Sequence, residues 1–337
     1  MLVSIDGGGL CASKTKRFGN YTFSLNMIEA LANFDRRNKY IIYSFCNKTQ
    51  DLILPSNFKY QQIPQQKFWL SGKVSLAEFI NKKDIFLALS QAIPFTKAKV
   101  IVFSHGLSFL FYKDFYSDSY NRLKNQLNQF ISRADVVIVS SSKVKAELKI
   151  LFPNLEPAVL LYGIPFDYQK SNKKSIRKEK PFFLFVGMNH PIKNVKFLVN
   201  SFKVFRRQIK YQNFDLYLVG DFMEFADKKA QVFSLGFCER QKIKNFYARA
   251  TAYLTSSLYE SFNLPVLEAL SQNCQVIGLK SAIIPELEKY VYSADNFDEF
   301  VQYMSTVASG KTKSINPNEL QNKFSWNNYI EHLTSFY

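Results

Sequence analysis

Residues 182–205, FFLFVGMNHPIKNVKFLVNSFKVF, contain the pattern that decides the fold of this 337-residue chain. Five consecutive apolar residues at 182–186 are followed by Gly187, and a helical repeat begins near Lys193. In this repeat one face carries Val195, Leu198, Val199, Phe202 and Phe205. A continuously apolar strand is typical of a parallel sheet that is covered on both faces. The stretch therefore predicts a strand, a loop and a helix of an α/β protein.

The same alternation runs along the whole chain. Expected strands are LVSID (2–6), KYIIYSF (39–45), KVIVFSH (99–105), DVVIVSS (135–141), AVLLYG (158–163), DLYLVG (215–220), AYLTSS (252–257) and CQVIGLK (274–280). Amphipathic helices such as residues 120–134 lie between them. This order predicts doubly wound α/β architecture. Since 337 residues exceed the size at which one core keeps growing, we expect two domains.

A basic stretch at residues 167–180, DYQKSNKKSIRKEK, separates the two halves. It is nearly devoid of apolar residues, as exposed linkers are. We predict an N-terminal domain at 1–166, the linker at 167–180, a C-terminal domain at 181–322 and a separate amphipathic helix at 323–337. Because parallel sheets bind ligands beyond the carboxyl ends of their strands, the expected ligand site is a cleft between these domains.

The net charge of +17 favours an anionic partner, which could be a phosphorylated ligand, a nucleic acid or an anionic membrane. The chain has no recognisable nucleic-acid-binding signature, so we expect no nucleic-acid partner, although a nucleic-acid binder stays the remotest alternative. The aromatic stretch FLFYKDFY at 109–116 would suit docking on an anionic membrane face, and an ordinary basic surface explains it equally well.

The four cysteines are far apart and form no CxxC pair. The three histidines have no spacing typical of zinc ligands. With an N-terminus that does not resemble a secretion signal, we expect reduced thiols in a cytoplasmic protein and neither disulfides nor a metal site.

A glycine motif at residues 7–12, GGGLCA, formally matches the dinucleotide fingerprint. The residues after it are polar, and the next strand ends in Cys46 and Asn47 where a ribose-binding acid would be required. We therefore expect a flexible glycine loop facing the cleft and no nicotinamide cofactor.

The segment SSLYESFNLPVLEAL at 256–270 combines two carboxylates with a helix start. Pro265 is typical of a first helical turn, so the helix should begin near 264–265. Glu260 then lies in the loop after a strand and Glu268 in the first turn of the helix. The backbone amides of Phe262 to Val266 would be available to an anion such as a diphosphate. Ordinary capping chemistry would also place a glutamate in the first turn.

Residues 258–287, LYESFNLPVLEALSQNCQVIGLKSAIIPEL, closely resemble glycosyltransferase family 4. The resemblance extends to RFGNYTFSLNMIEAL (17–31), FSHGL (103–107), VGMNHPIKNVKFLVNSF (186–202), VFSLGFCERQKIKNFYARATAYL (232–254) and FSW (324–326). It implies a GT-B fold, in which two Rossmann-like doubly wound domains face a cleft and a C-terminal helix crosses back to the N-terminal domain.

The resemblance also implies an activity and its residues. It is retaining transfer of a hexose from GDP-mannose or a UDP-hexose to a glycan or lipid-linked saccharide, with the nucleotide sugar as co-substrate and no metal or other cofactor. The residues implied as catalytic are Glu260, which contacts the donor sugar, His105 near the same sugar, and Lys193 at the diphosphate. Further donor-binding residues are Gly19, Gly187, Ser261, Phe262, Asn263, Leu264 and Glu268, the last at the ribose, with Phe237 and Cys238 near the nucleobase.

Two departures from the family pattern bear on activity. Met188 and Ile192 occupy positions where the family usually has an arginine near Lys193. Asn263 replaces a usual glycine, and asparagine tolerates the left-handed backbone conformation. An inactive GT-B protein that binds sugars or acts as a scaffold therefore remains the main alternative. We expect a cytoplasmic enzyme, with peripheral contact on the cytoplasmic membrane face left open.

Overall fold

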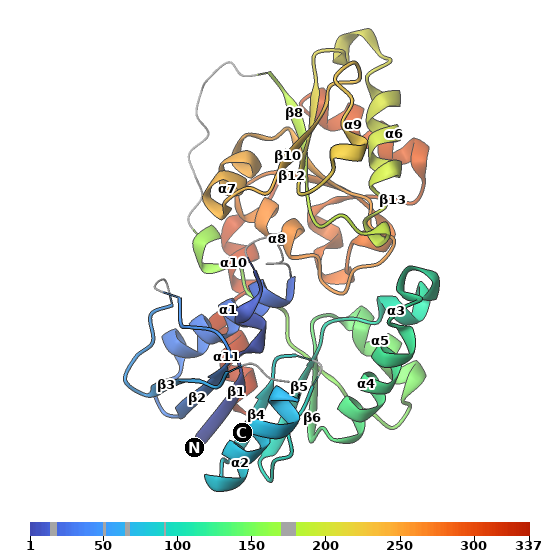
Figure 1. Ribbon diagram of the computed structural model, residues 1–337. Helices are drawn as coiled ribbons and strands as arrows, with labels where there is room; N and C mark the ends of the chain where they lie inside the picture. Colours follow the sequence, from blue (N-terminus) through green and yellow to red (C-terminus); the bar gives the residue numbers. More distant parts are fainter. Residues whose placement is uncertain (14–18, 50–51, 65–67, 91, 170–179) are drawn as a thin grey trace. The chain divides into compact units, whose positions relative to one another are not determined.

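The computed structural model describes residues 1–13, 19–49, 52–64, 68–90, 92–169 and 180–337 (Figure 1). The chain forms two compact units. Unit 1 comprises residues 1–163 and 325–337, and unit 2 comprises residues 164–324. The C-terminal segment therefore returns to the unit that contains the N-terminus, as the family resemblance implies.

Unit 1 is built on a parallel sheet of seven strands in the order β3-β2-β1-β4-β5-β6-β7. Its strands are β1 (Leu2–Asp6), β2 (Lys39–Ser44), β3 (Phe58–Gln62), β4 (Ile85–Ala88), β5 (Lys99–Ser104), β6 (Val136–Val139) and β7 (Ala158–Val159). All four residues of β4 and five of the six residues of β5 are buried, which agrees with a sheet covered on both faces.

Helices follow most of these strands. They are η1 (Gly8–Cys11), α1 (Gly19–Phe34), η3 (Trp69–Val74), α2 (Ser75–Ile80), α3 (Ser108–Phe111), η4 (Lys113–Tyr116), α4 (Tyr120–Ser132), α5 (Ser142–Leu151) and, from the end of the chain, α11 (Trp326–Thr334). At the return point Gly163 lies against Trp326, where a Cβ atom would come within 2.4 Å of the indole ring. The ring of Tyr162 stacks on Trp326 with centroids 6.3 Å apart, so the start of α11 is held in unit 1 by aromatic packing.

Unit 2 contains a parallel sheet of six strands in the order β10-β9-β8-β11-β12-β13. Its strands are β8 (Phe182–Val186), β9 (Asp215–Val219), β10 (Val232–Gly236), β11 (Ala252–Thr255), β12 (Gln275–Leu279) and β13 (Tyr292–Ala294). Both sheets have the order 3-2-1-4-5-6 of a doubly wound Rossmann-like domain, with one additional strand in unit 1.

The helices of unit 2 are η5 (Phe166–Tyr168), η6 (Pro191–Lys193), α6 (Val195–Phe205), η7 (Ile209–Tyr211), η8 (Met223–Phe225), α7 (Arg240–Arg249), α8 (Leu264–Ser271), η9 (Lys280–Ala282), η10 (Pro285–Tyr290), α9 (Phe297–Ala308) and α10 (Pro317–Lys323). The predicted face of α6 is buried at all five positions and packs onto Phe183 and Phe214. Residues 182–205 thus form part of the core of this unit. None of the described helices is both long enough and apolar enough to span a membrane.

Tyr168 differs from the prediction that residues 167–180 form an exposed linker. It is buried with 1% of its surface exposed, and its carbonyl accepts a 2.8 Å hydrogen bond from the side-chain amide of Gln272. Tyr168, an aromatic residue at the start of a polar stretch, packs in the core of unit 2. The charge pattern of that stretch does not indicate its burial. Residues 170–179 of the expected linker lie outside the described residues.

The cysteine prediction was wrong for one pair. Cys11 and Cys46 are joined by a disulfide, with Cα atoms 5.4 Å apart. Parallel pairing of β1 with β2 brings the turn after Asp6 beside the loop after Ser44, so cysteines 35 positions apart become neighbours. Cys238 and Cys274 are free thiols.

The expected flexible glycine loop is in fact a packed turn, η1. A Cβ atom on Gly7 would come within 2.7 Å of the Tyr43 carbonyl oxygen, and one on Gly9 within 2.5 Å of the Ser24 hydroxyl. Glycine is required here by close packing against β2 and α1, and residues 14–18 of the following segment lie outside the described residues.

Candidate functional site

The predicted donor residues of unit 2 follow two adjacent strands, β8 and β11. The neighbours of β8 in the sheet are β9 on one side and β11 on the other, so the strand order reverses between β8 and β11. In open α/β sheets such a switch point opens a crevice outside the carboxyl ends of the strands. Gly187 follows β8 directly and Glu260 lies in the loop after β11, which places both at the edge where a ligand would bind.

Lys193 is positioned by a short turn after β8. Pro191 starts η6, the Nδ1 atom of His190 accepts a hydrogen bond from the Ile192 amide at 3.2 Å, and Asn194 takes the left-handed conformation with φ 50°. The hydroxyl of Ser256, just after β11, lies 3.0 Å from the carbonyl oxygens of Lys193 and Asn194. The two loops that flank the switch point are therefore joined by hydrogen bonds.

Lys193 and Glu260 form an ion pair across this switch point. The Nζ atom of Lys193 lies 2.6 Å from Oε1 of Glu260, and the two side chains are 20% and 13% exposed. A partly dehydrated cation at this edge can meet a diphosphate, and the carboxylate can accept hydrogen bonds from sugar hydroxyls. Lys193 also lowers the pKa of His190, whose burial acts in the same direction and is the larger cause.

Helix α8 begins at Leu264 with Pro265 in its first turn, as predicted. Asn263 caps it with φ 68° and donates hydrogen bonds from Nδ2 to Thr255 Oγ1 at 3.2 Å and to the Ala282 carbonyl at 3.0 Å. The asparagine thus supplies the left-handed turn for which the family usually has glycine, and its buried side chain ties the loop to the ends of two other segments.

Two details of the predicted anion site were wrong. The amide of Val266 donates to the Asn263 carbonyl at 2.9 Å, so it belongs to the helix turn and is not available to a ligand. Glu268 lies beyond the first turn of α8, because the helix starts four residues before it. Its role therefore does not follow from helix capping.

Glu268 is a buried carboxyl, with 9% of its surface exposed. The hydroxyl of Tyr247 donates a 3.3 Å hydrogen bond to its Oε2 atom. Burial raises the pKa of Glu268 to about 7, although the Arg240 guanidinium and the Tyr247 hydroxyl act to lower it. Burying a carboxyl group costs free energy, and the Tyr247 hydroxyl is a single neutral donor to it. The carboxyl oxygens of Glu268 are therefore suited to accept further hydrogen bonds from a hydroxylated ligand.

The two positions where an arginine is usual differ in burial, because Met188 is half-buried and Ile192 is buried. Ile192 is buried at 6% exposure, so it packs in the core of unit 2 and an arginine there would not fit without rearrangement. Arg240 is close enough to Glu268 to influence its pKa, but its guanidinium binds Asp167 in bidentate fashion at 2.6 and 2.7 Å. Arg240 therefore acts on Glu268 electrostatically, while its guanidinium is already bound to the Asp167 carboxylate.

The predicted nucleobase residues follow β10. Gly236 takes a positive φ of 65°, Phe237 is 53% exposed, and Cys238 is half-buried. An exposed phenyl ring beyond the carboxyl end of a strand could stack on a base. The loop and first helical turn next to Glu260 contain Ser261, Phe262 and Leu264. Phe262 is buried and packs against Phe324.

In unit 1, His105 lies directly after β5. Its Nε2 atom is 2.8 Å from the Leu89 carbonyl and its Nδ1 atom 3.3 Å from the Tyr162 hydroxyl. Since a carbonyl only accepts, Nε2 carries the proton and Nδ1 can accept from Tyr162. Burial lowers the pKa of His105, which keeps the ring neutral near pH 7.

Gly19 is the first residue of α1, and a Cβ atom added to it would meet no atom within 4 Å.

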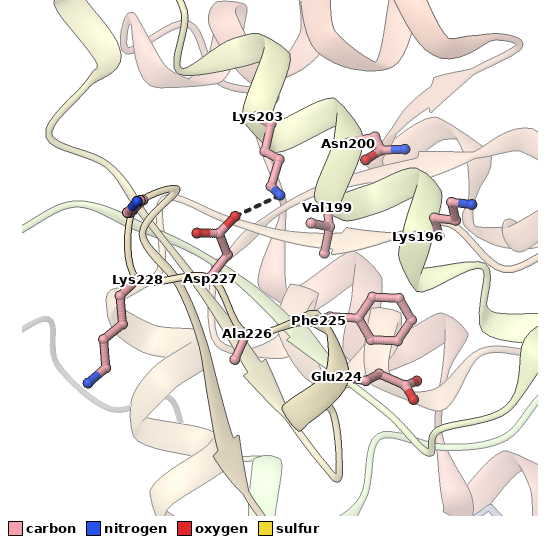
Figure 2. A pocket seen from close by; sticks show the side chains of 10 residues that line it. Lys196, Val199, Asn200, Lys203, Glu224, Phe225, Ala226, Asp227 and Lys228 are labelled. Carbon is pink, nitrogen blue, oxygen red and sulfur yellow. Dashed lines mark ion pairs between the residues drawn. The ribbon is translucent and has the colours of Figure 1, made fainter.

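A hollow of about 570 Å³ lies beside α6 and does not include the predicted donor residues (Figure 2). Lys196 and Lys203 of α6 line it on one side, and Glu224 and Asp227 line it on the other, where Lys203 pairs with Asp227 at 2.8 Å. Glu224 accepts a 3.0 Å hydrogen bond from the side chain of Asn189, which belongs to the loop after β8.

Within the described residues, no group of three or more His, Cys, Asp or Glu side chains is placed to hold a metal ion.

Residues 167–325 match the family model described as glycosyl transferases group 1. Unit 2 is a group 1 glycosyltransferase domain. O-antigen chain mannosyltransferase RfbU of Salmonella typhimurium strain LT2 is 25% identical over 222 residues, which are 62% of this chain and 59% of that protein. Lipopolysaccharide 1,6-galactosyltransferase of the same strain is 27% identical over 207 residues, 54% of this chain and 55% of that protein.

The chain spans between 30% and 59% of the lengths of the curated relatives that it matches. Among solved structures, sucrose-phosphate synthase from Thermosynechococcus elongatus superposes with a TM-score of 0.74 at 15% identity, over 100% of this chain and 98% of that one. The group 1 domain and unit 1 together therefore have the GT-B fold, with a Rossmann-like sheet in each unit.

Within the group 1 domain, sequence reasoning missed the partners of the predicted residues. Tyr247, Arg240 and Ser256 lie in or next to stretches that carry the family resemblance, but the sequence did not indicate that they surround Glu268 or Lys193. In unit 1 it missed Asp6, a buried carboxylate that accepts hydrogen bonds from the amides of Gly8 and Ser90. The available signal for Asp6 was an acidic residue at the end of an apolar strand and before three glycines.

Proposed function

We propose that the chain is a glycosyltransferase that moves a hexose from a nucleotide diphosphate sugar to a glycan or lipid-linked saccharide. The ion pair between Lys193 and Glu260 at the switch point of unit 2 carries this proposal. It is supported by the match to group 1 glycosyltransferases and by two relatives named for mannosyl and galactosyl transfer. These two names disagree on the sugar, so GDP-mannose and UDP-hexoses are both candidate donors.

In the proposed reaction, Lys193 exchanges its contact with Glu260 for the donor diphosphate and stabilises the charge that develops on the leaving phosphate. Glu260 is then available to the hydroxyls of the transferred sugar, and Glu268 to those of the ribose. A cation supplied by a lysine lets the chemistry proceed without a divalent metal, so we propose that transfer needs neither a metal nor another cofactor.

Transfer is proposed to retain the anomeric configuration, with the acceptor approaching on the face from which the leaving group departs. The bond between the anomeric carbon and the phosphate oxygen breaks, and a bond to the acceptor oxygen forms. The acceptor proton passes to the leaving phosphate. His105 is proposed to lie near the donor sugar as a neutral ring and not as a charged acid, because burial lowers its pKa.

Binding of UDP, GDP and ADP, followed by thermal unfolding, tests the donor class, since a ligand that binds only the folded state raises the melting temperature. Turnover of GDP-mannose, UDP-glucose and UDP-galactose, with and without EDTA, then tests the reaction and the metal. We expect one donor to be turned over in EDTA and Glu260→Ala to abolish turnover. Nucleotide binding without any donor turnover would instead support an inactive GT-B protein, which the absence of arginine at 188 and 192 would explain.

A further inference from the structure

An exposed apolar surface lies on unit 1 and includes none of the predicted site residues. It consists of Leu76, Phe79 and Ile80 of α2 together with Phe95, and these side chains are 62%, 72%, 70% and 67% exposed. We call these four residues the α2 surface. Large apolar side chains gathered in this way are costly in water and commonly mark a site of interaction.

The α2 surface is one continuous feature, because hydrogen bonds join its two segments. The amide of Phe95 donates to Ser75 Oγ at 2.8 Å, and the hydroxyl of Thr96 donates to Glu78 Oε2 at 2.7 Å. Ser75 and Glu78 are on the buried side of α2, which leaves the apolar side chains of the helix facing outward.

Cations lie directly on this surface. The Nζ atom of Lys97 is 5.3 Å from the centre of the Phe79 ring, and the Arg133 guanidinium is 5.3 Å from the centre of the Phe95 ring. Both distances are within the range of a cation–π contact. Aromatic rings and basic groups therefore share one patch.

A basic hollow of about 430 Å³ adjoins the α2 surface. Its lining includes Lys82, Lys97 and Lys99, together with Met1, Lys83, Asp84, Ile85 and Tyr337. Figure 1 shows α2 close to β4 and to both ends of the chain. Of the nearby carboxylates, Glu78 is buried, and Asp84 accepts a hydrogen bond from the Leu2 amide. Positive groups thus outnumber negative ones in this hollow.

We propose that the α2 surface docks on an anionic lipid bilayer. Phe79, Ile80 and their apolar neighbours would enter the region between headgroups and acyl chains, and the lysines of the basic hollow would bind lipid phosphates. The charge complementarity favours this occupant over a second copy of the chain. A symmetric dimer through this patch would bring the same cations of two copies together.

This assignment differs from the aromatic stretch 109–116, for which the sequence left membrane docking and an ordinary basic surface as equal alternatives. The structure buries Phe109 there and exposes Phe111 and Phe115 by 54% and 37%, which is a smaller apolar area than the α2 surface offers. The proposal is independent of the donor and of the reaction, so it can fail or succeed without affecting the proposed function.

Flotation of the full chain with vesicles tests the proposal, using phosphatidylcholine alone and phosphatidylcholine mixed with phosphatidylglycerol. We expect binding to the mixed vesicles only. The double variant Lys82→Gln/Lys97→Gln should weaken this binding about 30-fold, because each lysine at an anionic surface contributes roughly a factor of five. Phe79→Ser/Ile80→Ser should weaken it by at least about tenfold.

Two matched double variants separate a docking surface from the general positive charge of the chain. Lys228→Gln/Lys229→Gln removes two exposed charges from unit 2, and Ile53→Ser/Ile150→Ser removes two exposed apolar side chains elsewhere on unit 1. Both should bind as the parent does. Equal weakening by the two lysine pairs, or unchanged binding of Phe79→Ser/Ile80→Ser, would overturn the proposal. If the parent is a dimer and Phe79→Ser/Ile80→Ser is a monomer, the α2 surface binds a second copy of the chain instead of a membrane. Melting temperatures check that every variant is folded.

Discussion

The Nζ atom of Lys193 lies 2.6 Å from Oε1 of Glu260, although the two residues are 67 positions apart in the chain. The pair joins the loop after β8 to the loop after β11, which flank the point where the strand order of unit 2 reverses. Among the predicted donor residues, this pair brings a cation and a carboxylate together at the topological switch point of the sheet.

Lys193→Gln should reduce both stability and donor turnover. It leaves the largely buried Glu260 carboxylate without its cation, which should lower the free energy of unfolding by about 1–3 kcal/mol. Loss of the charge at the leaving phosphate should reduce turnover by about 100-fold. Urea denaturation and donor turnover measure the two effects. The exposed Lys196→Gln is the matched control, and unchanged donor turnover in the Lys193 variant would contradict the assigned role.

Glu268→Gln should change how stability depends on pH. The pKa of Glu268 is raised from 4.5 to about 7 in the folded protein, so between these pH values the folded state keeps a proton that the unfolded chain releases. The parent should therefore lose up to about 3 kcal/mol of stability as the pH rises from about 4.5 to about 7. The variant lacks this proton and should gain stability relative to the parent over the same range.

Urea unfolding of both proteins at pH 5 and pH 8 provides the measurement. Glu239→Gln, which changes an exposed carboxyl at the start of α7, should follow the parent at both pH values. Parallel pH profiles for the Glu268 variant and the parent would show that the buried carboxyl does not titrate as proposed.

Substitutions at Asn263 should separate its backbone role from its side-chain role. Asn263→Gly keeps the left-handed turn but loses the hydrogen bonds to Thr255 and Ala282, at a cost of about 1–2 kcal/mol. Asn263→Ala should cost about 1 kcal/mol more, because alanine is disfavoured at φ 68°. At exposed Asn273, which has φ 58°, glycine should be nearly neutral. If Asn263→Gly is the less stable of the two variants at that position, the backbone argument is wrong.

Gly19→Ala should leave the fold unchanged and impair donor binding. A Cβ atom at Gly19 meets nothing within 4 Å in unit 1, so the melting temperature should not change. If the backbone of this residue approaches the diphosphate, the added methyl group should raise the dissociation constant of the nucleotide. Gly163→Ala, whose Cβ would press on Trp326, is the contrasting case that should lose stability. Unaltered nucleotide affinity in Gly19→Ala would remove Gly19 from the donor site.

Reduction of the Cys11–Cys46 disulfide should lower the stability of unit 1 by about 4 kcal/mol, since the bond joins residues 35 positions apart and so constrains the unfolded chain. Thermal unfolding with and without reductant measures this difference. Alkylation of the unreduced, denatured protein should label Cys238 and Cys274 only. Labelling of all four cysteines would show that the pair is reduced in the isolated protein.

Patterns that depend on neighbouring positions determined much of this molecule from sequence alone. The apolar run 182–186 and the helical face from Val195 to Phe205 predicted β8 and α6, because a buried strand and an amphipathic helix leave a local signature. The start of α8 followed from Pro265, and the left-handed conformation of Asn263 was expected because it stands where the resembled family usually has glycine. The strands expected from the sequence did not include β3, β4, β10 and β13.

Only the tertiary structure decided which distant residues meet. The parallel pairing of β8 with β11 brings Lys193 to Glu260, and that of β1 with β2 brings Cys11 to Cys46. The pKa of Glu268 depends on burial and on Arg240, Asp167 and Tyr247, none of which is within 20 positions of it. Local sequence encodes the conformation of a segment, whereas burial and charge pairing arise from the packing of whole sheets. The residues of the site could therefore be proposed from the sequence, and their electrostatics could not.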